Sequence, residues 1–364
     1  MTSKKENHYK INTSEDNNMN NEQINKNANV LRVNNMNIYI NDTLEKDIQQ
    51  YINTSKIKSG YENLDMMTRL YPGLYVIGAL PSLGKTTFMH QMADQIAESG
   101  QKVLLFSIEQ TTLELATKSL SRIMAKNENL TNKSALDIRK SVLDDDTLEA
   151  IHEYSTYSGN ITIVECSYRA TLKDITDYIK NYIDKNNVKP VVIIDYLQVI
   201  QLPSGHHMTT KDVVEYHVKT LKQTQSDYNL VMMVISSFNR QNYLTQTDYE
   251  SFKESGGIEY TADVVWGLQL QVLNDELFDS QGKINEKREL VREAKRANPR
   301  KVELICLKNR FGISSYNCAF DYYSEFDWFR ADMGKVDLSL LMKNTDENGF
   351  VHLPDSLCDE LPFV

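Results

Sequence analysis

A short run between two apolar segments has the residue types of a phosphate-binding loop. Residues 79–87 are Ala-Leu-Pro-Ser-Leu-Gly-Lys-Thr-Thr, and they follow the apolar stretch 74–77. A strand that ends in a glycine-containing turn and opens a helix surrounds one point with backbone N–H groups, which bind polyphosphate. We expect Lys85 to reach the β- and γ-phosphates of a nucleotide and the Thr86 hydroxyl to ligate Mg²⁺. The residues predicted to bind the nucleotide are Ser82, Gly84, Lys85, Thr86 and Thr87.

One position of this run departs from the usual phosphate-loop pattern. The pattern begins with glycine, but this chain has Ala79 there, and Gly78 lies one residue earlier. The alternative is a turn that contains Gly-Lys-Thr by chance. The order of strand, loop and helix favours the phosphate loop, because each element falls where nucleotide binding needs it.

Polar residues end three of the predicted buried strands further along the chain. They are Glu109 after 103–108, Asp195 after 191–194, and Ser236 and Ser237 after 230–235. Ligands of α/β sheets bind at the carboxyl ends of strands, so we expect these side chains beside the phosphate loop. Asp195 would hold Mg²⁺, and Glu109 would orient and deprotonate the attacking water. The alternatives are a strand-end aspartate in a turn and an acid favoured by a helix N-terminus.

Two cations near the end of a later strand form a second candidate group. Lys308 and Arg310 are two residues apart and precede Gly312, so strand alternation directs both side chains to the same side. Such a pair can supply an arginine finger to a γ-phosphate bound by the next subunit. It can equally be a solvated strand end, and the residues alone leave both readings open.

The elements that must position these residues follow an α/β pattern. From about residue 59 to 335, buried apolar runs alternate with helical periodicity, which predicts one domain with a mostly parallel sheet covered by helices. Helices are expected from Thr86 to about Ser99, from Thr171 with a capping pair at Asp174, and over 211–227. Later strands are expected at 263–272, 302–308, 315–322 and 326–329, with the last ones antiparallel. The stretch 126–145 supports no prediction.

The two ends of the chain differ from this body in composition. Residues 1–41 hold thirteen asparagines and little aliphatic periodicity, which predicts disorder. Residues 42–58 predict an amphipathic linker helix, which would cap its own domain or pack as an arm on a neighbouring subunit. Residues 336–364 form an acidic tail ending in Leu-Pro-Phe-Val, predicted either to be a plain disordered end or to recruit partners.

Charge and composition exclude several classes of protein. The net charge is −10 and the pI is near 5.3, which argues against a broadly basic surface that coats nucleic acid. No apolar run is long enough to span a bilayer, and the N-terminus lacks a signal-peptide pattern. The four cysteines are widely spaced, so neither a zinc site nor a disulfide framework is indicated. These features predict a cytoplasmic protein that does not bind membranes.

Six segments in order resemble the ATPase domain of DnaB-type replicative helicases. They are residues 79–87, Phe-Ser-Ile-Glu at 106–109, Ile-Asp-Tyr-Leu-Gln at 194–198, Ser-Ser-Phe-Asn-Arg at 236–240, Glu-Ser-Gly-Gly-Ile-Glu at 254–259 with Ala262 and Asp263, and Lys-Asn-Arg at 308–310. The similarity covers about residues 59–330 and looks greatest to the helicase halves of phage and mobile-element primase–helicases. Alanine at the head of the phosphate loop is itself a feature of that family.

The resemblance implies a RecA-like P-loop ATPase that forms a six-membered ring and unwinds DNA in the 5′ to 3′ direction. ATP and Mg²⁺ would bind between subunits, and single-stranded DNA would pass through the centre. It implies that Glu109 is the catalytic base and Asp195 the Walker B acid. Lys85 and Thr86 would bind phosphate and Mg²⁺, while Lys308 and Arg310 would act on the neighbour's nucleotide. The implied DNA contacts are Arg240, Lys253 and, less strongly, Lys211.

The chain also departs from the family pattern. Ser237 stands where the family usually has a glutamine that senses the γ-phosphate, and Tyr260 and Thr261 replace a Gln-Asp pair. No N-terminal collar or primase domain is expected, so a separate primase or loader would supply those functions. Two other functions remain possible from the sequence: a RecA-like recombinase or repair ATPase without processive unwinding, and a non-catalytic ring or adaptor.

Overall fold

The computed structural model describes residues 36–54, 57–197, 200, 209–239, 243–252, 256–279 and 282–335. The chain divides into two units, residues 1–54 and 55–364. In the described part of the first unit, α2 (Met36–Asp42) and α3 (Leu44–Thr54) are helical, and the Tyr39 hydroxyl donates to Asp47 at 2.9 Å.

These helices correct two expected boundaries. Disorder was predicted to residue 41, but Met36–Asp42 forms the helix α2. The linker helix was predicted to reach residue 58, but α3 ends at Thr54 and Ile57 forms a β-bridge with Leu70 in the second unit. Residues 1–35 and the acidic tail at 336–364 lie outside the described residues.

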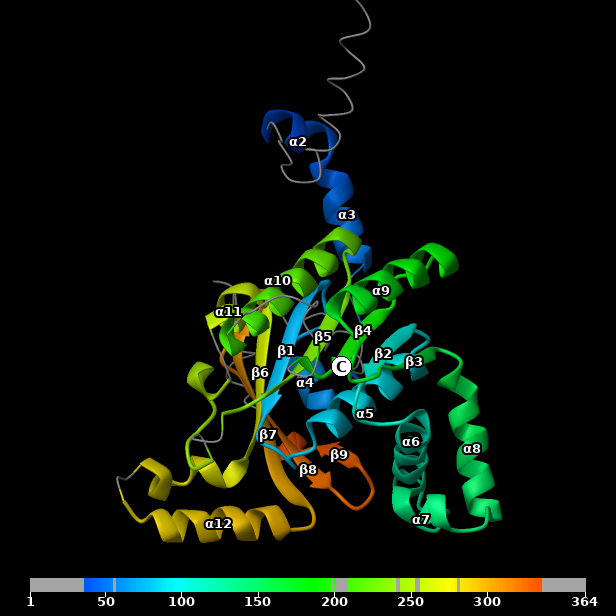
Figure 1. Ribbon diagram of the computed structural model, residues 1–364, viewed down its shortest axis with the longest axis vertical. Coiled ribbons are helices and arrows are strands. Elements are labelled where there is room, and N and C mark those ends of the chain that lie inside the picture. Colours follow the sequence, from blue (N-terminus) through cyan, green and yellow to red (C-terminus); the bar gives the residue numbers. More distant parts are fainter. Residues whose placement is uncertain are drawn as a thin grey trace, which may run out of the picture. The chain divides into compact units, whose positions relative to one another are not determined.

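Within its described part, the second unit is built on a nine-stranded sheet with the order β3-β2-β4-β5-β1-β6-β7-β8-β9 (Figure 1). The parallel strands are β1 (Gly73–Ala79), β2 (Val103–Ser107), β3 (Ile161–Glu165), β4 (Val191–Asp195), β5 (Val231–Ser237) and β6 (Val264–Leu270). The antiparallel strands are β7 (Arg300–Asn309), β8 (Asn317–Tyr323) and β9 (Trp328–Ala331). The predicted fold class is therefore confirmed, including the antiparallel strands near the C-terminal end.

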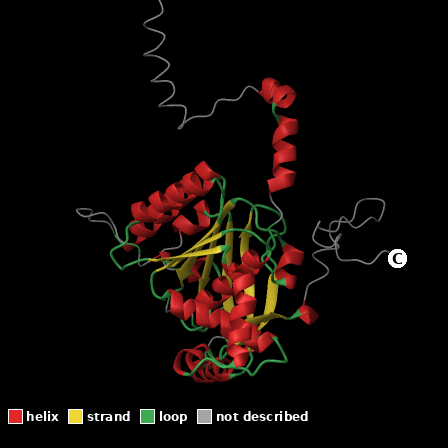
Figure 2. Ribbon diagram, turned by 90° about the vertical axis from the view of Figure 1, so that its right-hand side faces the viewer, coloured by secondary structure: helices red, strands yellow, loops and turns green. Residues whose placement is uncertain are grey.

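Helices cover both faces of this sheet (Figures 1 and 2). They are α4 (Glu62–Met67), α5 (Lys85–Glu98), α6 (Thr112–Lys126), α7 (Ala135–Lys140), α8 (Asp145–Ser158), α9 (Leu172–Asn186), α10 (Thr210–Tyr228), α11 (Gly256–Thr261) and α12 (Ile284–Arg296). Short 3-10 helices are η3 (Tyr249–Ser251), η4 (Gln271–Asn274), η5 (Glu276–Asp279) and η6 (Met333–Lys335). The crossover from β1 to β2 runs toward the β3 edge, whereas those leaving β3 and β4 run the other way. Right-handed crossovers therefore put α5 on one face and α9 and α10 on the other.

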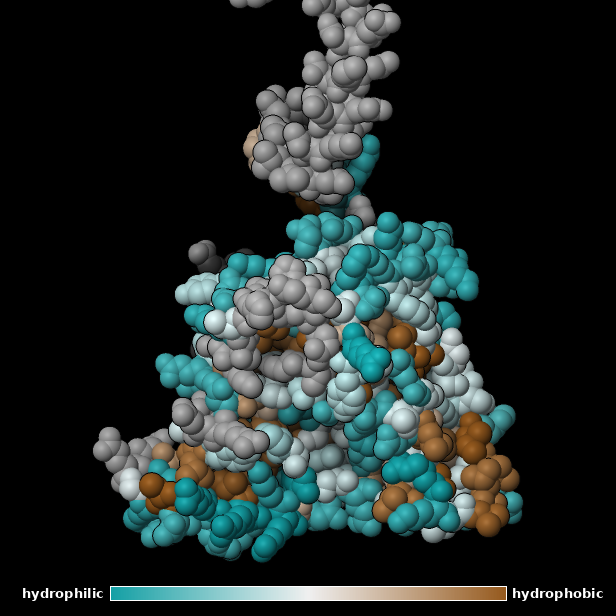
Figure 3. Space-filling view, in the orientation of Figure 1, coloured by the Kyte–Doolittle hydropathy of each residue, from teal (hydrophilic) through white to brown (hydrophobic). Residues whose placement is uncertain are grey.

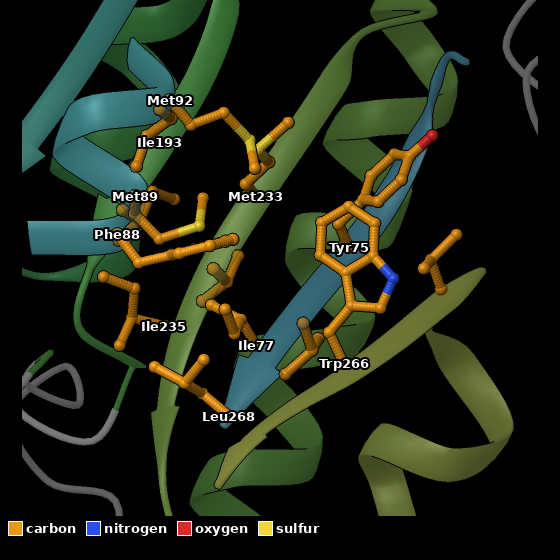
Figure 4. Packing of buried hydrophobic residues seen from close by; sticks show 14 of the residues in the cluster. Tyr75, Ile77, Phe88, Met89, Met92, Ile193, Met233, Ile235, Trp266 and Leu268 are labelled. Carbon is orange, nitrogen blue, oxygen red and sulfur yellow. The ribbon is translucent and has the colours of Figure 1, made fainter. Parts of the chain in front are cut away.

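The core holds the start of α5 at the carboxyl edge of the sheet. Phe88, Met89 and Met92 on α5 meet sheet side chains that include Ile193 and Met233 (Figure 4), and all five are at most 1% exposed. Burying a side chain of this size contributes about 1.5–3 kcal/mol. Every residue of β1 is buried, which explains why the parallel strands are continuous apolar runs in the sequence.

Local signals in the sequence are reproduced in several helices. The predicted capping pair at Thr171 forms a capping box with Asp174 at the start of α9. The stretch 126–145, for which no prediction was made, holds α7 and the first residue of α8. No helix among the described residues is both long and apolar enough to cross a lipid bilayer.

Candidate nucleotide site

The loop between β1 and α5 turns tightly against two aromatic rings from β8 and β9. Gly84, which caps α5, has φ +85°, a left-handed conformation that favours glycine. A Cβ on Gly84 would lie 2.8 Å from the ring of Tyr322 and 2.9 Å from that of Phe329. Ser82 also has a positive φ, 67°, and its carbonyl accepts a hydrogen bond from Arg300 Nη1 at 3.1 Å. The loop thus leads directly into the N-terminus of α5, where backbone N–H groups can bind an anion.

Ala79 fits this loop without strain. It is the last residue of β1 and is fully buried, and its carbonyl accepts hydrogen bonds from the Phe238 N–H and from Lys85 Nζ, each at 3.2 Å. The preceding residue, Gly78, is the position that requires glycine. A Cβ there would lie 2.2 Å from the ring of Phe238 and 2.5 Å from that of Phe252. The alanine that departs from the common pattern is therefore compatible with a phosphate loop.

A cavity of about 400 Å³ opens at this edge of the sheet. Its walls contain residues that the sequence indicated, namely Ser82, Gly84, Lys85, Thr86, Thr87, Glu109, Asp195 and Ser237. They also contain residues for which the sequence predicted no individual role, namely Pro81, Gln110, Lys118, Tyr196, Tyr322 and Asp327. The strands β1, β2, β4 and β5 thus deliver their polar ends to one place, as the α/β pattern predicted.

Burial shapes the electrostatics of the two central charges. It lowers the pKa of Lys85, while the nearby carboxylates of Asp195 and Glu109 act in the opposite direction. Burial also raises the pKa of Asp195 to about 6, with the charge of Glu109 adding to the rise and the side chains of Thr86 and Lys85 reducing it. A cation close to Asp195 would favour its charged form.

The donor set beside Lys85 fits a hard divalent cation. Thr86 offers a hydroxyl oxygen and Asp195 a carboxylate oxygen, and Mg²⁺ takes one or two protein oxygens together with substrate phosphates and water. Among the described residues, no group of three or more His, Cys, Asp or Glu side chains could hold a metal ion alone. Phosphate oxygens would therefore have to complete the coordination.

Glu109 lies in the cavity wall just beyond the end of β2. Unlike Asp195 it is exposed, so solvent can take up a proton that it accepts. Tyr196 is close by, and burial followed by the charge of Glu109 raises the pKa of this phenol. A solvated carboxylate beside a phosphate site is suited to orient water.

Lys308 and Arg310 lie at the opposite edge of the sheet. Because β7 runs antiparallel to β6, Lys308 pairs with Val265 near the start of β6. The start of β6 aligns with the middle of β1, at Tyr75 and Val76, while the phosphate loop leaves β1 after Ala79. The start of β6, where Lys308 pairs, therefore lies about 10–13 Å along the strand direction from the end of β1, where the phosphate loop begins. Neither cation lines the cavity.

Both cations are held near the start of β6. The Arg310 guanidinium forms an ion pair with Asp263 at 3.2 Å, and its side chain is 51% exposed. Lys222 binds the other oxygen of Asp263 at 2.6 Å. Lys308 Nζ donates to the carbonyl of Glu259 at 2.6 Å, and burial followed by the charge of Arg310 lowers the pKa of Lys308. The two side chains thus lie on the same side, as predicted, with Arg310 partly accessible.

The chain matches the family model described as "DnaB-like helicase C terminal domain" over residues 56–331. It belongs to this family. Curated relatives include the replicative DNA helicase DnaB of Mycoplasma genitalium, which is 30% identical over 71% of this chain and 53% of that protein. Another is the replicative DNA helicase DnaB of Helicobacter pylori strain J99, which is 25% identical over 74% of this chain and 59% of that protein. The chain thus spans little more than half the length of these relatives.

Two solved structures have the same fold. One is an ATPase domain that superposes with a TM-score of 0.64 at 22% identity, covering 82% of this chain and 99% of that one. The other is a DnaB-like replicative helicase described with its interactions with primase. It superposes with a TM-score of 0.62 at 22% identity, covering 85% of this chain and 74% of that one. At this identity the likeness shows the fold alone, and the predicted RecA-like core is confirmed.

The resemblance assigned three residues to DNA contacts, and the structure describes one of them, Lys211. Arg240 and Lys253 lie outside the described residues. Lys211 lies in the first turn of α10 and is exposed. Tyr260, at one of the positions that depart from the family pattern, is 77% exposed on α11, and its carbonyl accepts a hydrogen bond from Arg310 at 3.4 Å.

The largest addition to the site comes from the turn between β8 and β9. Asp327 accepts a hydrogen bond from the Thr87 hydroxyl at 2.9 Å and lies 3.3 Å from Lys118 Nζ. Its carbonyl accepts from Arg122 Nη1 at 2.7 Å. Thr87 therefore directs its hydroxyl to Asp327, and Lys118 joins the cavity wall as a second cation beside Lys85. These residues are far apart in sequence, so no local pattern could have brought them together.

Proposed function

We propose that this chain is an ATP-dependent replicative DNA helicase. The observation that supports it best is the convergence of Lys85, Thr86, Asp195 and Glu109 on one cavity within a DnaB-like domain. The relatives favour a helicase over the recombinase or repair ATPase, since those named above are replicative DNA helicases. We assign the ATPase domain to residues 59–335, between the N-terminal segment and the acidic tail.

The site would bind Mg-ATP through residues with distinct roles. Lys85 would neutralise the β- and γ-phosphates, with Ser82, Gly84 and Thr87 shaping the loop around them. Thr86 and Asp195 would hold Mg²⁺, which would supply charge stabilisation to the transferring phosphoryl group. Glu109 would orient the attacking water and accept its proton.

A second copy of the chain would complete this site. Lys308 and Arg310 are suited to stabilise the charge of the phosphoryl transition state, but they lie at the other edge of their own sheet. A closed ring of copies joined head to tail would bring them to the neighbour's cavity. We propose that the ring is a hexamer.

The N-terminal arm would join copies of the ring. Ile48 on the amphipathic helix α3 is 46% exposed, and so offers apolar surface to a partner. Apolar side chains also gather on the surface over α7 and α8 (Figure 3). They are Leu136, Val142, Leu143, Leu148 and Ile151, with Val142 90% exposed. We propose that α3 of one copy packs on this surface of the next, since exposed apolar patches mark interaction sites.

The DNA path and the partners follow from the same proposal. Single-stranded DNA would pass through the ring, contacted by Arg240, Lys253 and Lys211, with movement from 5′ to 3′. A structure with the same fold is described with its interactions with primase, so a primase is the first partner to test, together with a loader. The acidic tail is a candidate docking segment for such proteins. We place the protein in the cytoplasm.

The experiment is strand separation on a forked DNA duplex with purified protein, ATP and Mg²⁺. We expect unwinding by the wild type and none by Lys85→Ala. The matched control is Lys102→Ala, because Lys102 is a surface lysine that binds Asn160 away from the cavity. DNA-stimulated hydrolysis without unwinding would favour the recombinase or repair ATPase. A wild type with no DNA-stimulated hydrolysis would favour the adaptor.

A further inference from the structure

Helix α12 concentrates positive charge in an acidic chain. The segment from residue 283 to 301 has eight lysines and arginines and three glutamates, whereas the whole chain has a net charge of −10. Arg288, Arg292 and Arg296 repeat every four residues, so they form one row along the exposed side of α12. We call this row the arginine stripe. The glutamates of α12 lie on a neighbouring face instead of alternating with it.

This arrangement does not serve the stability of the helix. Like charges at i and i+4 destabilise a helix, and the arginine stripe contains two such pairs. Arg292 has one acidic partner, Glu289, at 3.0 Å on the exposed surface. Arg288 and Arg296 are exposed and form no hydrogen bond or ion pair with any residue in the described part of the chain. Two guanidinium groups are thus available to an external anion.

The inner face of α12 fixes the helix to the ATPase body. Val291 is buried, and Lys287 donates to the carbonyl of Phe278 at 3.2 Å. Beside the arginine stripe, Lys295 lies 5.2 Å from the ring centre of Tyr243, in the segment that follows β5. After α12 ends, Arg300 at the start of β7 donates a hydrogen bond to the carbonyl of Ser82 in the phosphate loop. Helix α12 therefore contacts the segment after β5, where the DNA contacts are predicted, and it leads into β7, whose first residue contacts the phosphate loop.

We infer that the arginine stripe of α12 binds the phosphate backbone of DNA, as a contact additional to those of the predicted central path. This inference rests on the proposed helicase function. Residues four apart on a helix are separated by about 6 Å of rise, which is similar to the spacing of neighbouring phosphates along an extended single strand, so successive arginines can meet successive phosphates. Arginine also binds phosphate with two parallel hydrogen bonds, which suits a backbone contact without base reading.

The test measures the affinity of the full-length protein for a labelled single-stranded oligonucleotide over a series of salt concentrations. We expect the triple variant Arg288→Ala, Arg292→Ala, Arg296→Ala to bind at least about tenfold more weakly, with a salt slope smaller by about 2. The matched control is Lys173→Ala, Lys180→Ala, Lys185→Ala on α9, which removes the same charge from another exposed helix. A variant with lysine at the three arginine-stripe positions should retain most of the affinity.

Three results decide the inference. If the alanine variant and the α9 control lose affinity equally, or neither loses any while the wild type still unwinds DNA, the arginine stripe is not a DNA contact and the helicase proposal stands. If the wild type neither binds nor unwinds DNA, both proposals fail. A photo-crosslinker at the exposed Asn285, on the same side of α12, should label the oligonucleotide; labelling of residues 336–364 or of a protein instead would overturn the inference.

Discussion

Lys85 and Arg310 lie at opposite edges of the same sheet. Lys85 follows the carboxyl end of β1, whereas Arg310 follows the end of the antiparallel strand β7 and pairs with Asp263 before β6. Both have the chemistry of phosphate binding, yet one chain cannot bring them to one nucleotide without unfolding the strands between them. The arrangement requires either two sites or two copies of the chain, and we favour two copies.

The first prediction concerns the acid that would hold Mg²⁺. Asp195→Asn should abolish ATP hydrolysis but raise the melting temperature of the nucleotide-free protein by a few degrees at about pH 8. The pKa of Asp195 is raised to about 6 in the folded state, so ionising this carboxyl costs the folded state on the order of 1–3 kcal/mol at neutral pH.

The pH dependence of this effect has a definite sign. The cost is absent below about pH 4, where the carboxyl is protonated in both states, grows as the pH rises to about 6, and is constant above that. The gain of Asp195→Asn should therefore be smaller at about pH 5 than at about pH 8. Thermal melts with a chelator present measure it, and an equal or lower melting temperature at about pH 8 would contradict the assignment.

The second prediction concerns the buried charges behind the cavity. Asp94 accepts hydrogen bonds from Arg122 and from Ser119, and both members of the ion pair are nearly fully buried. Asp94→Ala should lower the free energy of unfolding by about 3–5 kcal/mol, because it leaves the Arg122 guanidinium buried and unpaired. Urea unfolding measures this loss. The control is Lys173→Ala, which breaks the exposed pair with Asp177 and should leave the urea midpoint unchanged.

The same cluster contains a histidine that stays neutral. Burial lowers the pKa of His90 to about 4, so the ring is uncharged at neutral pH. The unfolded chain, whose histidine has its ordinary pKa near 6.5, therefore binds more protons than the folded state, and wild-type stability falls as the pH drops from about 8 to about 6. His90→Asn removes this titrating group, so its cost in stability should be smaller at about pH 6 than at about pH 8. Urea unfolding at the two pH values measures this difference, and an equal cost at both would contradict a lowered pKa of His90 in the folded protein.

The third prediction compares substitutions at Gly78 and Ala79, the last two residues of β1. Gly78→Ala should destabilise the protein by about 1–3 kcal/mol and impair nucleotide binding, since the new Cβ would overlap the ring of Phe238. Ala79→Gly should cost at most about 1 kcal/mol and retain hydrolysis, because residue 79 ends a strand in this structure. Chemical denaturation and steady-state turnover test the pair. Equal loss of turnover in both variants would mean that Ala79 is part of the functional loop.

The sequence was sufficient for the parallel part of the fold and for the centre of the site. The strands β1, β2, β4 and β5 are buried on both faces and thus appear as continuous apolar runs, and the polar residue after each marks the carboxyl edge. Asp195 and Glu109 could be assigned to the cavity for this reason. The capping box of Thr171 is local and was equally visible.

Other features of the site and the fold depend on contacts between residues far apart in sequence, which no local pattern can predict. Asp327 reaches Thr87 and Lys118 only because β9 folds back beside α5, more than two hundred residues along the chain. Helix α7 has six residues, too few to show a helical period. Helix α12 lies between the predicted strands that became β6 and β7, and its charged sequence suggested no role.

The most direct test of a two-copy site mixes two inactive proteins. Alone, Lys85→Ala and Arg310→Ala should each lose at least about 100-fold in DNA-stimulated ATP hydrolysis. In a mixed ring, an Arg310→Ala copy has an intact phosphate loop and a Lys85→Ala copy has an intact arginine. The control is Lys222→Ala, which removes the other partner of Asp263 and should stay active.

If each nucleotide site is built from two copies of the chain, the mixture should regain ATP hydrolysis. The rate of hydrolysis should reach its maximum near equal proportions of the two variants. No recovery at any ratio, with mixed assembly confirmed by mass, would contradict the claim that one copy completes the nucleotide site of the next.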